Sequence, residues 1–290
     1  LDLLSKTCRD TMREMLQAIE LPCSSTRSVH VTIDVSDVTP FRLDSTTNEA
    51  YSIKFDEDGE MDVSAKSCLG ALRAMQTVKQ LSRNGTLPKM FHIVDSPSFP
   101  HRGLMIDTGR NYLPIDLIKS TLVTMGSVKL NVLHWHIVDS QLFPYEPPFN
   151  KNMLNSPDGK YTQNDVKDII HFAMLRGIRV IIEVDSPAHT YSWGKAYPQL
   201  MTCNKLEDQI HKKCPSPPCG TLNVKEYPAD VLATVNMVWD DILQAKYQDD
   251  FVHLGGDEIT PDCTPRKAVE KHLAGVAKHL KQKGKTSIIW

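Results

Sequence analysis

The sequence lacks the features that mark several large classes of protein. No apolar run approaches the roughly 20 residues that a membrane-spanning helix needs, and 33 basic residues nearly balance 35 acidic ones, for a formal net charge of −2. Without an excess of positive charge, the chain has no general electrostatic attraction to nucleic acid or to an anionic membrane. We therefore expect no nucleic-acid partner and no membrane span, and the balance favours a neutral or amphiphilic substrate.

Cysteine motifs for metal binding are also missing. The seven cysteines form no CxxC pair, which argues against structural zinc. Cys214 and Cys219 stand at the two ends of the short segment CPSPPC, as in a loop closed by a disulfide. Because the number of cysteines is odd, we expect one thiol to stay unpaired.

Other features favour the secretory route. Asn84 begins the glycosylation sequon Asn-Gly-Thr in a turn-like stretch. The chain starts at Leu1, with neither a methionine nor a signal peptide, as a processed chain would. The sequon and the disulfide candidates together predict a lysosomal or secreted glycoprotein.

Residues 1–98 are predicted to form a small α+β domain. Apolar residues recur at near-helical spacing from Leu3 to Ile19, and the segment SCLGALRAMQTVKQLS predicts a second helix. Runs in which apolar and polar residues alternate predict strands. These runs are residues 29–35, 51–55, 61–63 and 89–97.

From Phe99 onward the pattern changes to strand, loop and helix. Near-continuous apolar runs predict strands of a parallel sheet that is buried on both faces. They cover residues 102–108, 129–139, 177–185, 251–258 and 286–290. Amphipathic helices are expected between them, starting at Pro114, after the N-cap Thr162, near 228, and with Pro265 as the first helical residue. Repeated β-α units predict a (β/α)8 barrel or an open doubly wound sheet.

Polar residues at the strand ends favour the barrel. A barrel assembles its active site from all of its βα loops, whereas an open sheet concentrates the site at one switch point and commonly carries a Gly-rich phosphate turn, which is missing here. The residues in question are Asp107 with Arg110, Asp139, Asp185 with His189, and Asp257 with Glu258. We therefore predict an α/β fold in which residues 99–290 form a TIM-type (β/α)8 barrel, with about five of its strands present.

The segment FVHLGGDEIT places two adjacent carboxylates after an apolar run and two glycines. Neighbouring residues of a strand point to opposite faces, so Asp257 and Glu258 can serve one pocket only where the strand gives way to a loop. Two carboxylates this close disfavour double ionisation, which suits one of them to act as an acid. The paired glycines would let a bulky ligand approach the backbone. A solvated loop is the alternative, whereas a GGDEF-type cyclase loop needs Phe where Ile259 stands.

His134 and His136 have the spacing that sends both imidazoles to one face of a strand. They could bind a metal, as in barrel metallohydrolases. No third histidine stands out at a matching strand end, so we favour a hydrogen-bonded pair in the barrel core, and we expect neither a metal nor another cofactor.

The remaining strand-end residues allow two interpretations each. The planar guanidinium of Arg110 suits a pair of sugar hydroxyls or a carboxylate, and the alternative is a salt bridge with Asp107 or Asp139. Asp139 stands at a strand end, where it could contact a ligand or have no ligand role. Asp185 and His189 could pair, so that the carboxylate fixes the imidazole tautomer, or His189 could be a structural residue.

Four motifs in order, HRGLMIDTGRNYLP, KLNVLHWHIVDSQLFPYE, RGIRVIIEVDSPAHTYSWG and FVHLGGDE, closely resemble glycoside hydrolase family 20. The resemblance is to the β-N-acetylhexosaminidases of the lysosomal, chitobiase-like type. The segment GALRAMQTVKQL is similar to the end of the small α+β domain that precedes the barrel in that family. The resemblance therefore implies an accessory domain over residues 1–98 and a catalytic barrel over residues 99–290.

The resemblance implies hydrolysis of terminal β-linked N-acetylhexosamine residues, GlcNAc or GalNAc, from glycoconjugates or chitooligosaccharides. The mechanism would be retaining, with the 2-acetamido oxygen of the substrate in place of an enzymic nucleophile. Glu258 would be the general acid, and Asp257 would hold the acetamido N–H.

Further site residues follow from the same resemblance. Arg110 and Asp139 would bind hydroxyls of the terminal sugar, and Asp185 with His189 would support Glu258. Trp290 matches an aromatic wall of the sugar site. Other implied members are His253 and His136, as supporting residues, and a disulfide between Cys203 and Cys263.

The sequence also departs from the family pattern. Ser140 replaces a second acid, SPAH replaces TPGH, and the loop after Glu258 is short. The chain ends at Trp290, before the last three barrel strands of the family. It would then be a piece of a longer protein or a truncated relative that needs a partner, and a non-catalytic glycan-binding or scaffold protein is the alternative function. A homodimer is a further expectation from the family.

Overall fold

The computed structural model describes residues 8–10, 12–13, 29–37, 43–82, 86–204, 220–245, 247 and 249–290. The predicted Cys214–Cys219 loop, the sequon residue Asn84 and most of the helix predicted from Leu3 lie outside these residues. The chain divides into two compact units. The first comprises residues 1–102, 122–131 and 173–179, and the second comprises 103–121, 132–172 and 180–290.

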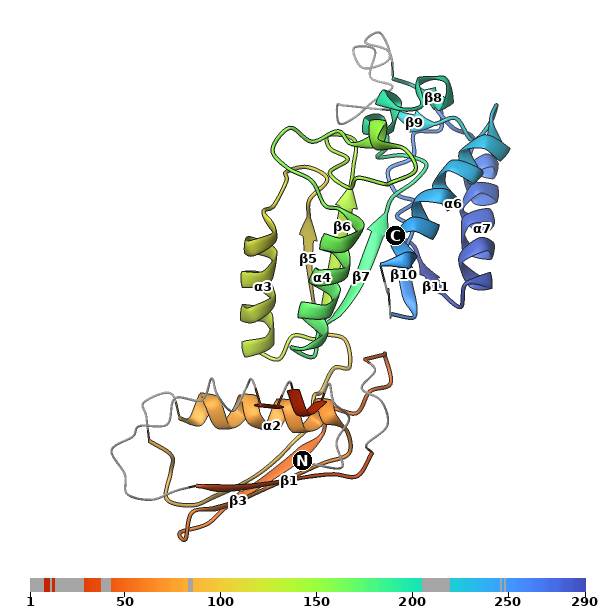
Figure 1. The fold of residues 1–290 in the computed structure, drawn as a ribbon. Helices are drawn as coiled ribbons and strands as arrows, with labels where there is room; N and C mark the ends of the chain where they lie inside the picture. The colour runs from red at the N-terminus through yellow and green to blue at the C-terminus, as the bar shows by residue number, and fades with distance from the viewer. Residues whose placement is uncertain are drawn as a thin grey trace. The chain divides into compact units, whose positions relative to one another are not determined.

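The first unit is built on a four-stranded sheet with helix α2 (Cys68–Leu81) on one face (Figure 1). Its strands, in the order β1-β3-β2-β4, are β1 (His30–Val35), β2 (Tyr51–Phe55), β3 (Glu60–Ala65) and β4 (Phe91–Asp95). Side chains along β2 and β3 alternate between buried and more exposed, and the buried set packs with α2 in one core. The predicted small α+β arrangement is confirmed, whereas the boundary at residue 98 stays a prediction.

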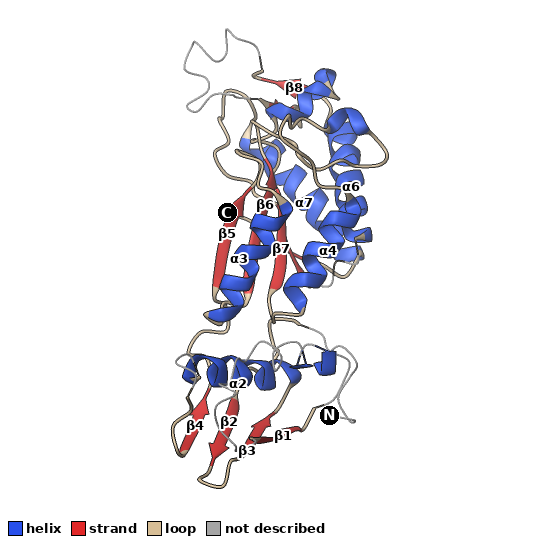
Figure 2. Ribbon diagram, turned by 60° about the vertical axis from the view of Figure 1, so that its left-hand side comes forward, coloured by secondary structure: helices blue, strands red, loops and turns tan. Residues whose placement is uncertain are grey.

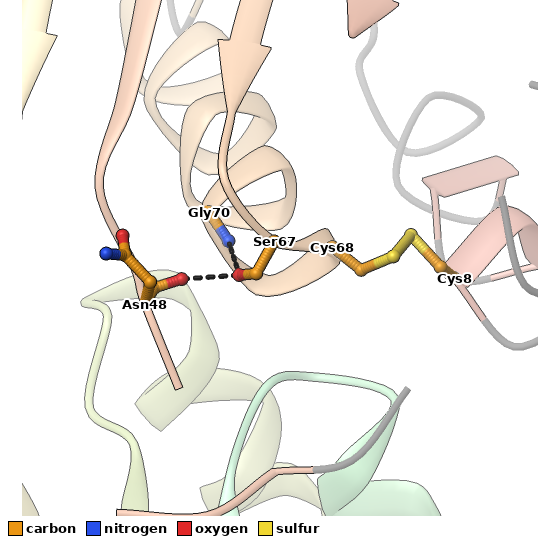
Figure 3. Close-up of a disulfide and its surroundings, with 5 residues drawn as sticks. All are labelled: Cys8, Asn48, Ser67, Cys68 and Gly70. Atoms are coloured by element: carbon orange, nitrogen blue, oxygen red, sulfur yellow. Dashed lines mark hydrogen bonds between the residues drawn. A yellow bond between two sulfur atoms is a disulfide. The ribbon is translucent and has the colours of Figure 1, made fainter. Parts of the chain in front are cut away.

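Helix α2 starts at a capped and cross-linked end (Figure 3). The hydroxyl of Ser67 accepts a hydrogen bond from the backbone N–H of Gly70 at 3.1 Å and donates one to the carbonyl oxygen of Asn48. The next residue, Cys68, forms a disulfide with Cys8, a pair that no pattern in the sequence predicts. The cap satisfies one of the free N–H groups at the start of the helix.

The second unit contains a five-stranded sheet in which spatial order follows chain order, β11-β10-β7-β6-β5. The strands are β5 (Gly103–Asp107), β6 (Val132–Val138), β7 (Arg179–Val184), β10 (Phe251–His253) and β11 (Thr286–Ile288). The pairs β5–β6, β7–β10 and β10–β11 are parallel. A doubly wound sheet reverses its order at a switch point, and this sheet does not. The predicted α/β class, with a sheet of the (β/α) barrel type, is confirmed.

Helices follow the strands and run alongside them (Figure 2). They are α3 (Ile115–Ser127), α4 (Gln163–Met174), α6 (Pro228–Gln244) and α7 (Arg266–Gln282). The predicted N-cap Thr162 exchanges hydrogen bonds with Asp165 at the start of α4. Pro265, predicted inside the last helix, instead precedes it. Among the described residues, no helix combines the length and the apolar character that crossing a membrane requires.

Short elements occupy the loops after β6 and β7. In the described part of these loops they comprise three 3₁₀ helices and a two-stranded ribbon of β8 with β9. The ribbon lies beyond the carboxyl ends of the long strands (Figure 1). Their bounds are η1 (Lys151–Met153), η2 (Tyr191–Lys195), η3 (Pro198–Leu200), β8 (Met201–Thr202) and β9 (Thr221–Leu222).

Burial differs between the central and the outer strands of the sheet. Every residue of β7 is buried, and so are all but one of β6, as their apolar runs predict. The prediction of burial on both faces is wrong for β5 and β11, where Leu104 is 40% exposed and no residue of β11 is fully buried. Both are edge strands, each paired on one side within the described part of the chain.

Candidate active site

The predicted polar residues converge at the carboxyl ends of four strands in the second unit. Arg110 follows β5, Asp139 follows β6, Asp185 and His189 follow β7, and Glu258 follows β10. Strand β10 is shorter than predicted because Gly255 and Gly256 both have positive φ angles, +67° and +93°, which end the extended backbone. The carboxylates after β10 therefore stand in a loop, as one shared pocket requires.

Arg110 forms both of the salt bridges that the sequence allowed as alternatives. Its Nη1 lies 2.6 Å from Asp107 Oδ2, and its Nη2 lies 2.9 Å from Asp139 Oδ2. The side chain of Arg110 remains 39% exposed, whereas that of Asp139 is 1% exposed. The guanidinium is thus held in a fixed orientation with part of its edge open to solvent.

His189 lies at the centre of the site. Its Nδ1 is 3.3 Å from Asp139 Oδ2, and its Nε2 is 3.4 Å from Glu258 Oε2. The same Nε2 is 3.9 Å from Asp185 and 4.0 Å from Asp257. Burial would lower the pKa of His189, but the hydrogen bond to Asp139 and the surrounding negative charges raise the pKa to about 9. His189 is therefore an imidazolium at neutral pH, with the carboxyl groups of four residues around it.

Asp185 occupies the space that the sequence analysis assigned to a ligand. A Cβ atom placed on Gly255 would lie 1.9 Å from Asp185 Oδ1, and that oxygen accepts the backbone N–H of Gly256 at 2.8 Å. The interpretation of Gly255 as room for a ligand is therefore wrong, because the missing side chain makes room for Asp185. Burial raises the pKa of Asp185 well above its ordinary value, and the charge of His189 only partly opposes this.

Asp257 and Glu258 differ in their surroundings. The side chain of Glu258 is 61% exposed on a backbone with a φ of +48°, and it forms an ion pair with His189. Asp257 is 37% exposed, yet its Oδ1 is buried and has no hydrogen-bond partner within the described residues. A buried acceptor without a donor is costly, so Asp257 presents an unfilled hydrogen-bonding position beside Glu258.

A second group of side chains lies around Glu183, a residue that the sequence analysis missed. Glu183 Oε2 lies 2.6 Å from His134 Nε2 and 3.0 Å from His136 Nδ1. Its Oε1 lies 3.4 Å from His253 Nδ1 and accepts the indole N–H of Trp290 at 2.8 Å. A signal was present in the sequence: Glu183 is the one charge in the run VIIEV and stands two residues before Asp185, on the same face of the strand.

Two triplets have the composition of a metal site, with possible ligand atoms within 4.8 Å of one another. They are His134 with Glu183 and His253, and Asp185 with His189 and Asp257. The sequence analysis named His253 only as a supporting residue and did not recognise it as a third histidine beside His134 and His136. In both triplets the carboxylates already face a cation, because the pKa values of His136 and His189 are raised to about 10 and about 9. The charge balance favours hydrogen-bonded imidazoles over a bound cation.

The disulfide that the resemblance implies is present. Cys203, after β8, and Cys263, in the loop that carries Glu258, are joined, with their Cα atoms 5.7 Å apart. The bond connects the loop after β7 to the loop after β10, and both loops carry residues of the site.

Comparison with known proteins points to one group. The family model "Glycosyl hydrolase family 20, catalytic domain" matches residues 99–290, and "beta-acetyl hexosaminidase like" matches residues 10–81. The β subunit of mouse (Mus musculus) beta-hexosaminidase is 39% identical over 226 residues, 75% of this chain and 40% of the relative. Beta-hexosaminidase 3 of Arabidopsis thaliana is 40% identical over 224 residues, 72% of this chain and 39% of the relative.

Solved structures of the same group share the fold. A chitobiase from Flavobacterium johnsoniae superposes with a TM-score of 0.81 at 22% identity, over 99% of this chain and 48% of that one. A β-N-acetylhexosaminidase from Bacteroides fragilis superposes with a TM-score of 0.73 at 26% identity, over 97% of this chain and 60% of that one. The chain spans about 40% of the length of the curated relatives named above.

Proposed function

The chain belongs to glycosyl hydrolase family 20, and on that premise we propose that it hydrolyses terminal β-linked N-acetylhexosamine residues of glycans by a retaining, substrate-assisted mechanism. The observation that carries the proposal is the convergence of Asp257 and Glu258 on His189, with His189 Nε2 at 4.0 Å and 3.4 Å from their carboxylates. Two carboxylates that share one cation in a strand-end loop can divide the work of proton transfer and substrate orientation.

Glu258 is the general acid and base in this proposal. Its exposed carboxyl group protonates the glycosidic oxygen as the bond to the anomeric carbon breaks. The acetamido oxygen of the substrate attacks the same carbon from the opposite face, which gives an oxazolinium ion and the free aglycone. Glu258, now ionised, then takes a proton from the water that opens the ring, so configuration is retained.

Asp257 orients the acetamido group. Its buried, unpaired Oδ1 is suited to accept the acetamido N–H, which would turn the acetamido oxygen toward the anomeric carbon. The negative charge of Asp257 also stabilises the positive charge that develops on the oxazolinium ring. Both effects act most strongly in the transition state, as efficient catalysis requires.

Arg110 and Trp290 form the remaining sugar contacts. Arg110, partly exposed, donates to hydroxyls of the terminal sugar, while the buried Asp139 fixes Arg110 and His189 from behind. Trp290 is 56% exposed, so part of its indole is accessible for stacking on the apolar face of the sugar. Asp185 and His253 support these groups from buried positions.

The test is a kinetic comparison in the full-length protein with aryl N-acetyl-β-glucosaminides. We expect Glu258→Gln to lower kcat about 10²- to 10⁴-fold, the usual contribution of general acid catalysis. The loss should grow as the leaving group becomes less acidic, because a good leaving group needs less protonation. Glu270→Gln is a matched control, since Glu270 is 60% exposed and pairs with Arg266 on helix α7. Unchanged turnover in Glu258→Gln would refute the assignment.

A second candidate is a glycan-binding or scaffold protein without turnover. Calorimetric titration of the 290-residue chain with an oxazoline-mimicking inhibitor separates the two. Binding without any hydrolysis by the wild-type protein would favour the second candidate.

The setting in which the protein acts is also part of the proposal. The two disulfides, Cys8–Cys68 and Cys203–Cys263, favour an oxidising compartment, so the protein is proposed to be lysosomal or secreted. A homodimer remains a prediction from the resemblance, and sedimentation of the full-length protein tests it.

A further inference from the structure

Glu183 and His136 lie behind the residues that face the sugar, and no step of the proposed hydrolysis uses them. Glu183 in β7 has an exposed fraction of 0%, and His136 in β6 has one of 3%. A carboxylate that is cut off from water persists only when partners compensate for its charge. The partners of Glu183 therefore indicate what it is for.

We propose that Glu183 and His136 form a buried charged link that positions Trp290 on one side of the sugar site and Arg110 on the other. Glu183 is then a positioning residue and not a catalytic one. This inference rests on the proposed function, because it assigns Glu183 to the same sugar site.

At one end the link holds Trp290. The indole N–H donates to Glu183 Oε1 at 2.8 Å, while the backbone N–H of Trp290 donates to the Gly255 carbonyl at 3.1 Å. The ring centroids of Trp290 and His253 are 4.6 Å apart, and His253 Nδ1 is 3.4 Å from the same Glu183 oxygen. A half-exposed indole would otherwise be free to change rotamer, so one buried carboxylate oxygen defines the plane on which a sugar can stack.

At the other end the link reaches Arg110 through two contacts. His136 Nδ1 lies 3.0 Å from Glu183 Oε2, although without a hydrogen bond of normal geometry, and His136 Nε2 lies 2.9 Å from Asp139 Oδ2. The same Asp139 oxygen lies 2.9 Å from Arg110 Nη2. The imidazole of His136 therefore lies between the carboxylate of Glu183, which holds Trp290, and the carboxylate of Asp139, which holds Arg110.

The link needs a positive charge in its middle. Burial alone would lower the pKa of His136, but its contacts with Asp139 and Glu183 raise the pKa to about 10. Burial would raise the pKa values of Asp139 and Glu183, but their histidine partners hold both pKa values well below the ordinary range. The partners of Asp139 are His136 and His189, and those of Glu183 are His134, His136 and His253. At neutral pH the link therefore runs from the carboxylate of Glu183 through the imidazolium of His136 and the carboxylate of Asp139 to the guanidinium of Arg110.

The substitution Glu183→Gln breaks the link without a large change of shape. Glutamine can still accept the indole N–H of Trp290, but it has no charge, and its amide donors would face His134 and His136. His136 would then keep one carboxylate partner, Asp139, instead of two. We expect Trp290 and Arg110 both to lose their fixed positions.

Kinetics in the full-length protein test the positioning role. Trp290 and Arg110 hold the sugar in both the ground state and the transition state, so Glu183→Gln should raise KM about tenfold with a smaller change in kcat. In a Trp290→Phe background the same substitution should raise KM only about threefold, because one of the two residues that it acts through is gone. Equal effects in both backgrounds would overturn the proposal.

Nuclear magnetic resonance tests the link without relying on turnover. The indole N–H signal of Trp290, identified as the one that Trp290→Phe removes, should shift in Glu183→Gln. The imidazole of wild-type His136 should stay protonated between about pH 6 and 8, and in Glu183→Gln it should titrate at lower pH than in the wild type. A neutral wild-type His136 at pH 7, or an unmoved indole signal, would overturn the proposal.

Two further variants separate this outcome from misfolding and from failure of the proposed function. Asp241→Asn removes another buried carboxylate, 5% exposed and bonded to Tyr145 and Gln163, and it should reduce stability while leaving KM and both signals unchanged. If Glu183→Gln does not fold, Glu183→Asp keeps the charge but withdraws it from Trp290, so only the indole signal should move. A wild-type protein that shows both signals but no hydrolysis would refute the proposed function alone.

Discussion

At the scale of single residues, the site depends on the missing side chain of one glycine. Gly255 has no Cβ, and Asp185 fills the space that a Cβ would need, where it accepts the N–H of Gly256. Asp185 in turn lies 3.9 Å from His189, the cation that Asp257 and Glu258 share. The glycine therefore affects the electrostatics of the site by making room for the carboxyl group of Asp185.

The substitution Gly255→Ala tests this role against a matched glycine. Gly284 also has a positive φ, +76°, but nothing lies within 4 Å of a Cβ built on it, so Gly284→Ala should cost about 1–2 kcal/mol of backbone strain alone. Gly255→Ala should cost more than about 3 kcal/mol, because Asp185 must also move. Urea unfolding of both variants measures the difference, and equal losses would contradict the account.

At the scale of elements, the sequence predicted what depends on local pattern. The apolar runs located the strands, and the polar residues at their ends converge in the candidate site, because parallel strands bring their carboxyl ends to one edge. Glu183 was missed, although it is the one charge in an apolar run, because its partners His134, His136 and His253 lie on other strands. The wrong ligand role of Gly255 and the missed disulfide Cys8–Cys68 have the same cause. The contact of Gly255 with Asp185 and the Cys8–Cys68 bond both join residues that are far apart in the chain.

The two disulfides allow a test of how the loops around the site are held. Each joins cysteines 60 positions apart, so loop-closure entropy assigns each about 4 kcal/mol of stabilisation. Cys203–Cys263 joins two loops of the site, whereas Cys8–Cys68 lies in the first unit. We expect Cys203→Ala with Cys263→Ala to lower kcat/KM about tenfold or more.

The matched control is Cys8→Ala with Cys68→Ala, assayed at a temperature where both variants remain folded. It should lose comparable stability and keep its kcat/KM for the aryl glycoside. Loss of activity in both variants to the same degree would mean that the loop disulfide acts through stability only.

At the scale of the whole molecule, buried histidines define a window of pH in which the fold is most stable. The pKa values of His136 and His189 are raised to about 10 and about 9, so their stabilisation is complete below the ordinary value of 6.5 and is lost as pH rises through the raised values. Burial acts in the opposite direction on His272 and lowers its pKa to about 4. The acidic and the alkaline limits of stability therefore come from different residues.

His272 provides the last prediction. It lies on helix α7, 5% exposed, and its Nε2 is 3.0 Å from the hydroxyl of Ser186, next to Asp185 in the site. Between pH 6.5 and about 4 the unfolded chain binds a proton at this residue that the folded chain refuses, so stability should fall with pH by up to about 3 kcal/mol. His272→Gln should remove that part of the pH dependence in urea unfolding at a series of pH values. His171→Gln, at an exposed position of α4, controls for loss of a histidine as such, and an unchanged acid slope in His272→Gln would show that other groups set the limit.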